Sequence, residues 1–400
     1  MILKVKKDVW VVELKNQKNT TNNKKFLKIC IITLICILLA IVIARYITEE
    51  EFRNYVDTDI LKKQVEQNTL SSIEIDYEST PSIFAYDKYV AILSKNTLSI
   101  YTANGEKAAT LEINISKPVV NSRGKYLVIA EQDGKKIYLI GDTSIIWQTD
   151  IDGEISRVNV NKNGYVSVIV TNTTYKSVII SYNQTGKELF RTYLSSTYAI
   201  CADISNNNKY LAIGEVDYSG TIVKSNVKII SIALAQSSPK ESVINKYESE
   251  IGQIINNIRY QDKDTAICMF NSYVQKVSLD SNERLIDIED NALFLDINLN
   301  NKIAIVEKQS SGLFSYEYEM KIKSTTGISE NLYILDSDVP RNIIICGDTV
   351  GINLGTEVQI VNSRGMLLKK YKSKQEIKSL VVGSNIAGII FKDKIELINL

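Results

Sequence analysis

Histidine is absent from all 400 residues of the sequence. Its absence excludes Ser-His-Asp and Cys-His catalysis, histidine-ligated metals and imidazole pH switches. A Walker loop, a dinucleotide fingerprint and a metal-spaced cysteine pair are also missing. We therefore expect no catalytic residues, no cofactor and no metal site in this chain.

Proline is scarce, with four residues, and no low-complexity tract occurs. The formal net charge is +1, so the sequence predicts no nucleic-acid partner. Of the five cysteines, Cys30 and Cys36 belong to one long apolar run, whereas Cys201, Cys268 and Cys346 lie in short, distant apolar runs. This odd, scattered set predicts buried free thiols and no disulfide framework.

The longest apolar run lies near the N-terminus, at residues 26–47. As a helix it would be about 33 Å long, which is enough to cross a hydrocarbon core of about 30 Å. A cleaved signal peptide would end in a small-x-small site, but this run ends in Ala44-Arg45-Tyr46-Ile47. The pattern favours a permanent transmembrane helix.

The charges on either side of this run predict its orientation. Residues 1–25 carry seven lysines against Asp8 and Glu13, whereas acidic residues gather just after the run. Positive flanks stay in the cytosol. We therefore expect a short cytoplasmic tail, 1–25, and an extracytoplasmic C-terminal domain.

The rest of the chain repeats one pattern, in which a turn precedes a continuous apolar run at intervals of about 43 residues. An alternating strand, a Gly or Asn turn and a more polar strand follow, giving four strands per unit from inner to outer. The repeated turns contain Asp87, Gly124, Gly164, Asn208, Asp264, Asn301, Asp348 and Asn385.

This period predicts an all-β fold, a β-propeller spanning 69–400, with eight blades, or seven if the weak unit around Asp264 is not a blade. The last unit supplies three strands only. We expect Ser71–Tyr77 to provide its fourth strand and so to close the ring between the two ends of the domain. Wider intervals predict insertions near "SSPKES" and "SSGLFSYEYE".

Residues 48–68 separate the apolar run from the repeats. Phe52, Val56, Ile60 and Val65 recur at near-helical spacing. The spacing predicts a helical stalk, either solvated or amphipathic and packed against a partner.

The segment "RYITEEEFRNYVDTDILKK", between one apolar run and a degenerate propeller, resembles an uncharacterised bacterial family of single-pass, membrane-anchored propeller proteins. A weaker likeness is to quinoprotein-type repeats: "YNQTGKELFR", Tyr182 to Arg191, is similar to their turn-and-strand signature, with Phe190 where those repeats carry Trp. The second resemblance implies WD-like propellers that include outer-membrane assembly factors, which bind partners without catalysis.

Two further features are candidate binding sites. Asp150-Ile151-Asp152-Gly153-Glu154 places three carboxylates in one turn, but it is too short for a complete calcium loop, so a plain acidic turn is favoured. Tyrosine is common, at 22 residues against 8 Phe. Tyrosines on a ring face can stack on sugars or anchor proteins, and strand propensity also accounts for them.

Together these patterns predict a non-catalytic cell-envelope protein whose propeller binds a protein or cell-wall glycan partner. One alternative is a sensory ectodomain that signals through another protein. A second alternative is an enzyme of quinoprotein or glycan-cleaving type.

Overall fold

The computed structural model describes residues 20–49, 52–53, 56, 71–75, 81–312, 315–327, 329–335 and 339–400. Contacts divide the chain into two compact units, Met1–Leu61 and Lys62–Leu400, which we describe separately. Of the predicted stalk, 48–68, only residues 48–49, 52–53 and 56 are described, and most of the predicted tail, 1–25, lies outside the described residues.

Helix α1, Thr20–Thr48, dominates the first unit. Its stretch Lys28–Thr48 has a mean hydropathy of 2.7, and it is the one helix among the described residues that is long and apolar enough to cross a membrane. From Ile29 to Ile47, the isoleucine and leucine side chains of this stretch are all exposed. Near the end, Arg45 and Glu49 form an ion pair of 2.8 Å one helical turn apart.

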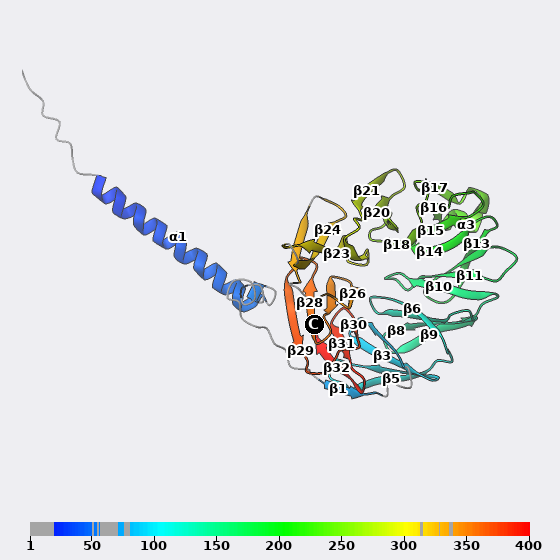
Figure 1. Ribbon diagram of the computed structural model, residues 1–400, viewed down its shortest axis with the longest axis horizontal. Helices are drawn as coiled ribbons and strands as arrows, with labels where there is room; N and C mark the ends of the chain where they lie inside the picture. Colours follow the sequence, from blue (N-terminus) through cyan, green and yellow to red (C-terminus); the bar gives the residue numbers. More distant parts are fainter. Residues whose placement is uncertain are drawn as a thin grey trace, which may run out of the picture. The chain divides into compact units, whose positions relative to one another are not determined.

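The second unit is a β-propeller of eight blades, each a four-stranded antiparallel sheet (Figure 1). The first strand of each blade lines the centre of the ring and the fourth lies at the rim. Eight blades are confirmed, and the unit around Asp264 is one of them, so the seven-blade alternative is wrong.

The strands of blades 1 to 4, from the centre outward, are β2 (Ser82–Tyr86), β3 (Tyr89–Ser94), β4 (Thr97–Tyr101) and β5 (Lys107–Glu112); β6 (Pro118–Arg123), β7 (Tyr126–Glu131), β8 (Lys136–Gly141) and β9 (Ser144–Asp150); β10 (Glu154–Val160), β11 (Val166–Thr171), β12 (Ser177–Tyr182) and β13 (Glu188–Leu194); β14 (Tyr198–Ile204), β15 (Tyr210–Asp217), β16 (Lys224–Ser231) and β17 (Val243–Glu248).

Those of blades 5 to 8 are β18 (Ile255–Tyr260), β19 (Ala266–Phe270), β20 (Tyr273–Val277) and β21 (Asn282–Asp287); β22 (Ala292–Asp296), β23 (Lys302–Ser310), β24 (Tyr316–Ser324) and β25 (Glu330–Ile334); β26 (Asn342–Cys346), β27 (Thr349–Asn353), β28 (Glu357–Asn362) and β29 (Leu367–Lys372); β30 (Ser379–Val382), β31 (Ile386–Ile390), β32 (Lys394–Asn399) and β1 (Ser71–Glu74).

The core lies between the blades. Each of its eight clusters of buried side chains is shared by two neighbouring blades. In β3, Val90 and Ile92 join the cluster with blade 8, whereas Ala91 and Leu93 join the cluster with blade 2. Because strand side chains alternate between faces, a strand packed on both sides must be apolar throughout. This explains the continuous apolar runs, which form the second strand of each blade.

The ring closes as the sequence predicts. Strand β1 pairs antiparallel with β32, with Ser71 opposite Leu397 and Glu74 opposite Lys394. Ile73 of β1 is buried in the cluster shared by blades 8 and 1. The N-terminal strand therefore completes the C-terminal blade and covers its edge.

The two predicted insertions are also confirmed. One is a short helix, α3 (Ile232–Ser237), with the turn η3 (Pro239–Glu241), between β16 and β17. The other lies at β23 and β24, which are nine residues long each.

Candidate functional site

The turns between the first and second strands of the blades, here called the inner turns, gather at one end of the ring. Asp87, Asn208 and Asn301 adopt positive φ angles of 48°, 60° and 51°. This left-handed backbone is least strained for Gly, Asn and Asp. The turn residues repeated in the sequence thus allow tight reversals around the central opening.

A cavity of about 810 Å³ occupies the centre of the ring. All eight blades line it, through their first strands or through the inner turns that follow. Part of the wall is apolar, including Phe84, Ile344 and Val382. The lining also includes three cationic side chains, Arg123, Lys162 and Arg259, against the single carboxylate of Asp348.

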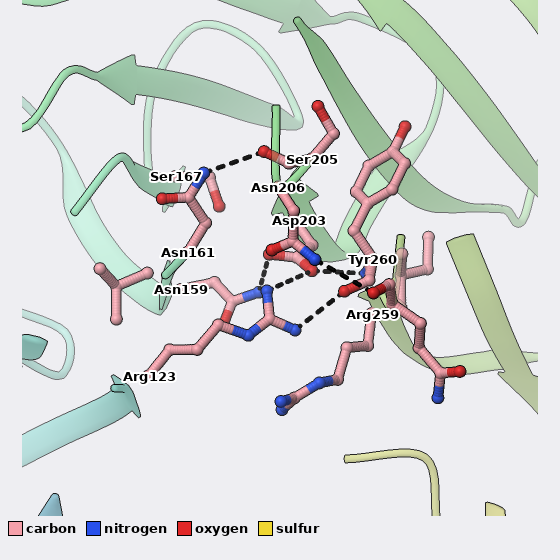
Figure 2. A network of polar contacts seen from close by, with 12 residues as sticks. Arg123, Asn159, Asn161, Ser167, Asp203, Ser205, Asn206, Arg259 and Tyr260 are labelled. Atoms are coloured by element: carbon pink, nitrogen blue, oxygen red, sulfur yellow. Dashed lines mark hydrogen bonds and ion pairs between the residues drawn. The ribbon is translucent and has the colours of Figure 1, made fainter. Parts of the chain in front are cut away.

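A polar network beside this cavity is centred on Asp203 of β14, whose side chain is 1% exposed (Figure 2). Its Oδ1 accepts a hydrogen bond from Nδ2 of Asn159 at 2.9 Å, and its Oδ2 accepts one from the backbone N–H of Tyr260 at 2.7 Å. Arg123 completes the network with an ion pair of 3.4 Å to Oδ2.

Burial raises the pKa of the Asp203 carboxyl, whereas Arg123 and the Tyr260 N–H oppose that shift. Desolvation is the larger effect, since water reaches almost none of the side chain. The hydrogen bonds and the ion pair to its partners are therefore needed to offset the cost of burying this carboxylate. We assign this network a structural role that binds four successive blades to one another.

Arg259 of β18 carries a half-buried guanidinium, with a different environment. Its Nη1 donates to Oδ1 of Asn298 at 2.6 Å, and none of the ion pairs among the described residues includes it. Burial lowers its pKa to about 9, and the charge of Arg123 adds to the effect, whereas Asp203 and Asp296 oppose it. Arg259 thus brings a positive charge to the cavity wall without a directly paired anion.

Amide side chains connect consecutive inner turns. Nδ2 of Asn161 donates to Oδ1 of Asn208 at 2.7 Å, and Nδ2 of Asn206 donates to the carbonyl of Gln261 at 3.1 Å. The amide of Gln261 in turn donates to three carbonyls of the next blade, those of Ile297, Leu299 and Lys302. These bonds hold the mouth of the cavity in a fixed geometry.

Exposed apolar side chains gather at the opposite end of the ring, where the second and fourth strands end. We call this set the tyrosine surface. The Tyr175 and Tyr193 rings lie 4.7 Å apart, and those of Tyr198 and Tyr218 lie 6.0 Å apart. Its members, from blades 3 and 4 and the connection to blade 5, are Tyr175, Tyr193, Tyr198, Tyr218, Ile222 and Ile251.

The acidic turn from Asp150 to Glu154 does not gather its carboxylates. Ile151 is buried, and Glu154 accepts a hydrogen bond from Asn172 at 2.8 Å. Within the described ranges, no group of three Asp, Glu, Cys or His side chains is arranged to hold a metal ion. A plain acidic turn accounts for the motif.

The quinoprotein-like segment from Tyr182 to Arg191 forms the hairpin between β12 and β13. Oδ1 of Asn183 accepts from the N–H groups of Thr185 and Lys187, and Phe190 is buried in the core. The turn of Asn362 repeats this arrangement with Arg364 and Met366. The signature therefore has a structural role in shaping hairpins.

The prediction of free thiols is confirmed. Cys201 and Cys268 are buried, and Cys346 is half-buried on the wall of the cavity. Burial raises the pKa of Cys201 to about 12 and raises those of Cys268 and Cys346 as well.

Sequence reasoning missed Arg123, Asp203 and Arg259. A signal was present, because Asn159, Asp203 and Arg259 are each the penultimate residue of an inner strand, β10, β14 and β18. Blade-by-blade alignment of the inner strands would have placed these polar residues together at the centre.

Solved propeller structures share this architecture at low sequence identity. BamB from Moraxella catarrhalis is 12% identical, with a TM-score of 0.51 over 83% of this chain and 97% of that one. Sqt1 from Chaetomium thermophilum, bound to the N-terminus of the ribosomal protein L10, is 11% identical, with a TM-score of 0.51 over 83% of this chain and all of that one. These similarities establish the fold alone.

Comparison with curated proteins finds no match. The sequence model of a family of unknown function, DUF5711, matches residues 61–400, which include the entire propeller. The resemblance to an uncharacterised propeller family is thereby confirmed, and the chain belongs to the DUF5711 family.

Proposed function

We propose that this protein is a non-catalytic, membrane-anchored envelope protein that binds a protein partner through the tyrosine surface. The observation that carries the proposal is the exposure of large apolar side chains at one end of blades 3 and 4. Tyr218 is 50% exposed, Ile222 is 59% exposed and Ile251 is 71% exposed. Contiguous exposed apolar groups with a polar rim are typical of interaction sites.

The members of the tyrosine surface are linked. Nζ of Lys176 lies 5.1 Å from the ring centre of Tyr198 and joins the two tyrosine pairs, because Lys176 follows Tyr175 directly. The N–H of Gly252 donates to the carbonyl of Val223 at 3.0 Å, which brings Ile251 near the loop of Ile222. Tyrosine anchors carry much of the binding energy in protein interfaces, since they bury a large area with few rotatable bonds.

The aliphatic members favour a protein over a cell-wall glycan. Sugars stack on aromatic rings, so a glycan would use the tyrosines but would gain little from Ile222 and Ile251. A protein partner buries both kinds of side chain in one interface. The Sqt1 propeller, whose structure is bound to the N-terminus of the ribosomal protein L10, supports the proposal by analogy of fold.

We propose the orientation predicted from the lysine-rich N-terminus, with the propeller outside the cytoplasmic membrane. Protease added to intact spheroplasts should then digest the propeller, whereas a tag at residue 1 should stay protected. Protection of the propeller would overturn the orientation.

Photo-crosslinking in cells tests the partner. A photoreactive phenylalanine at Tyr218 in the full-length chain should give a discrete crosslinked protein. The matched control is Tyr316, which is also 50% exposed but belongs to blade 6. Equal crosslinking from both positions, or none from Tyr218, would contradict the proposed surface. A glycan-sized shift at Tyr218 would instead favour cell-wall binding.

We also propose that the protein has no catalytic activity. Dye reduction after reconstitution with a quinone, or release of soluble fragments from cell-wall glycan, would contradict it. A sensory role would instead be supported by a signalling protein in the crosslinked product.

A further inference from the structure

The central cavity has the size and chemistry of a ligand site that the tyrosine surface does not explain. Its volume, about 810 Å³, falls within the range of small-molecule pockets. The cavity combines apolar walls with a few polar groups, as such pockets do. It lies along the ring axis and extends to the inner turns, opposite to the end that bears the tyrosine surface.

Arg259 is the unusual group in this cavity. A charge that is partly withdrawn from water is normally paired, because its desolvation is unfavourable. Arg123 meets this requirement through Asp203, but Arg259 has only the neutral Asn298 within hydrogen-bond distance of its Nη1. The nearest carboxylates are engaged elsewhere: Asp203 by Arg123, Asn159 and Tyr260, and Asp296 by the N–H of Asn298.

We propose that the central cavity binds a small molecule bearing a phosphate or carboxylate group, and that Arg259 holds this group. A guanidinium offers a planar pair of donors that fits either oxyanion. Lys162, at the mouth, adds a second positive charge. The apolar side, including Phe84 and Ile344, contacts the rest of the ligand.

The cavity also contains its own reporter, the half-buried thiol of Cys346. We would treat the full-length protein in detergent with two methanethiosulfonates, one carrying a sulfonate and one a trimethylammonium group. Because burial of the thiol slows both reagents, their rate ratio reports the local potential. We expect the ratio of the anionic to the cationic rate to be about fivefold higher at Cys346 than in a cysteine peptide.

Variants assign the effect to Arg259. Arg259→Met should lower the rate ratio toward that of the peptide, and Arg259→Lys should retain most of it. Arg157→Met is the matched control, because Arg157 also lies on an inner strand and donates to a carbonyl, that of Asn256 at 3.2 Å, but is exposed and does not line the cavity. Cys346→Ser measures reaction at the other cysteines.

Millimolar inorganic phosphate and citrate are then tested as probes of the two oxyanion classes. Slower modification of Cys346 by either probe in the wild-type protein, but not in Arg259→Met, supports the site and identifies the class that it prefers. A wild-type ratio equal to that of the peptide, or no protection by either probe, would overturn the proposal. The wild-type measurements decide this even if Arg259→Met fails to fold, and they are independent of any partner at the tyrosine surface.

Discussion

Arg123, the last residue of β6, forms an ion pair with Asp203 of β14, with 3.4 Å between Nη1 and Oδ2. Its Nη2 also donates to the carbonyl of Tyr260 in β18, at 3.1 Å. A single side chain of blade 2 thus reaches blades 4 and 5 across the centre of the ring. The exposed fractions of the side chains are 11% for Arg123 and 1% for Asp203. At such low exposure, removing one charge leaves the other without a counter-ion, which destabilises the fold.

Replacing Asp203 should therefore destabilise the propeller strongly. Asp203→Ala leaves Arg123 buried without its counter-ion, and we expect a loss of about 3–5 kcal/mol in the free energy of unfolding. Denaturant titration of the full-length protein measures this loss. Glu188→Gln, in the more exposed pair with Arg191, should cost less than about 1 kcal/mol. Equal effects of the two substitutions would contradict the importance of the central pair.

The closing strand should be required for folding. Deleting Lys394–Leu400 removes β32 and leaves β1 without its partner, so we expect no cooperative folding. As a milder test, Ile73→Ala should cost about 2–4 kcal/mol, because it empties a buried position between blades 8 and 1. The control Ser72→Ala changes an exposed neighbour in the same strand. A truncated protein that melts cooperatively as a monomer would refute ring closure.

The thiols of Cys201 and Cys268 should resist alkylation at pH 8 in the folded protein. Burial raises the pKa of Cys201 to about 12, so its reactive thiolate is nearly absent. In the unfolded chain the same thiol ionises near its ordinary value of 9.0, so stability should fall as the pH rises from 9 toward 12. Peptide mass spectrometry after iodoacetamide treatment, with and without denaturant, measures both sites. Rapid labelling without denaturant would contradict their burial.

At an inner turn with positive φ, the effect of a substitution on stability should depend on how well the new residue adopts the left-handed backbone conformation. Asn301 is exposed and has a φ of 51°. Asn301→Val should destabilise the propeller by about 1–2 kcal/mol, because a β-branched residue resists the left-handed region. Asn301→Gly should be nearly neutral, and thermal unfolding of the pair measures the difference. If Val and Gly behave alike, the conformation of the turn is not a constraint.

The propeller could be predicted from the sequence because its signals are local and repeated. Every inner turn precedes an apolar run, and a strand between two blades has no polar face. The closing strand is predictable too, because the last unit lacks a fourth strand and Ser71–Tyr77 alternates near the start; the observed strand is Ser71–Glu74. The segment "DKDTAICMF" matches the repeated pattern weakly, which is why the sequence alone leaves seven blades as an alternative.

The cavity and its charges could not be predicted in the same way. Arg123, Asp203 and Arg259 are far apart in the sequence, and they meet only because the ring brings their strands to one axis. The tyrosine surface had a compositional signal, the high tyrosine count. Strand propensity explains that count equally well until exposure separates Tyr218 from buried residues such as Tyr86.

The pairing of β1 with β32 also constrains the order in which the protein can assemble. Ser71 leaves the ribosome more than three hundred residues before its partner Leu397, so the first strand must wait unpaired while seven blades are synthesised. During that interval the nascent chain presents an open edge and an apolar face at each end of an unfinished arc. A nascent chain that ends just before Lys394 therefore lacks the strand that pairs with both β1 and β31, and it leaves an edge of each unpaired.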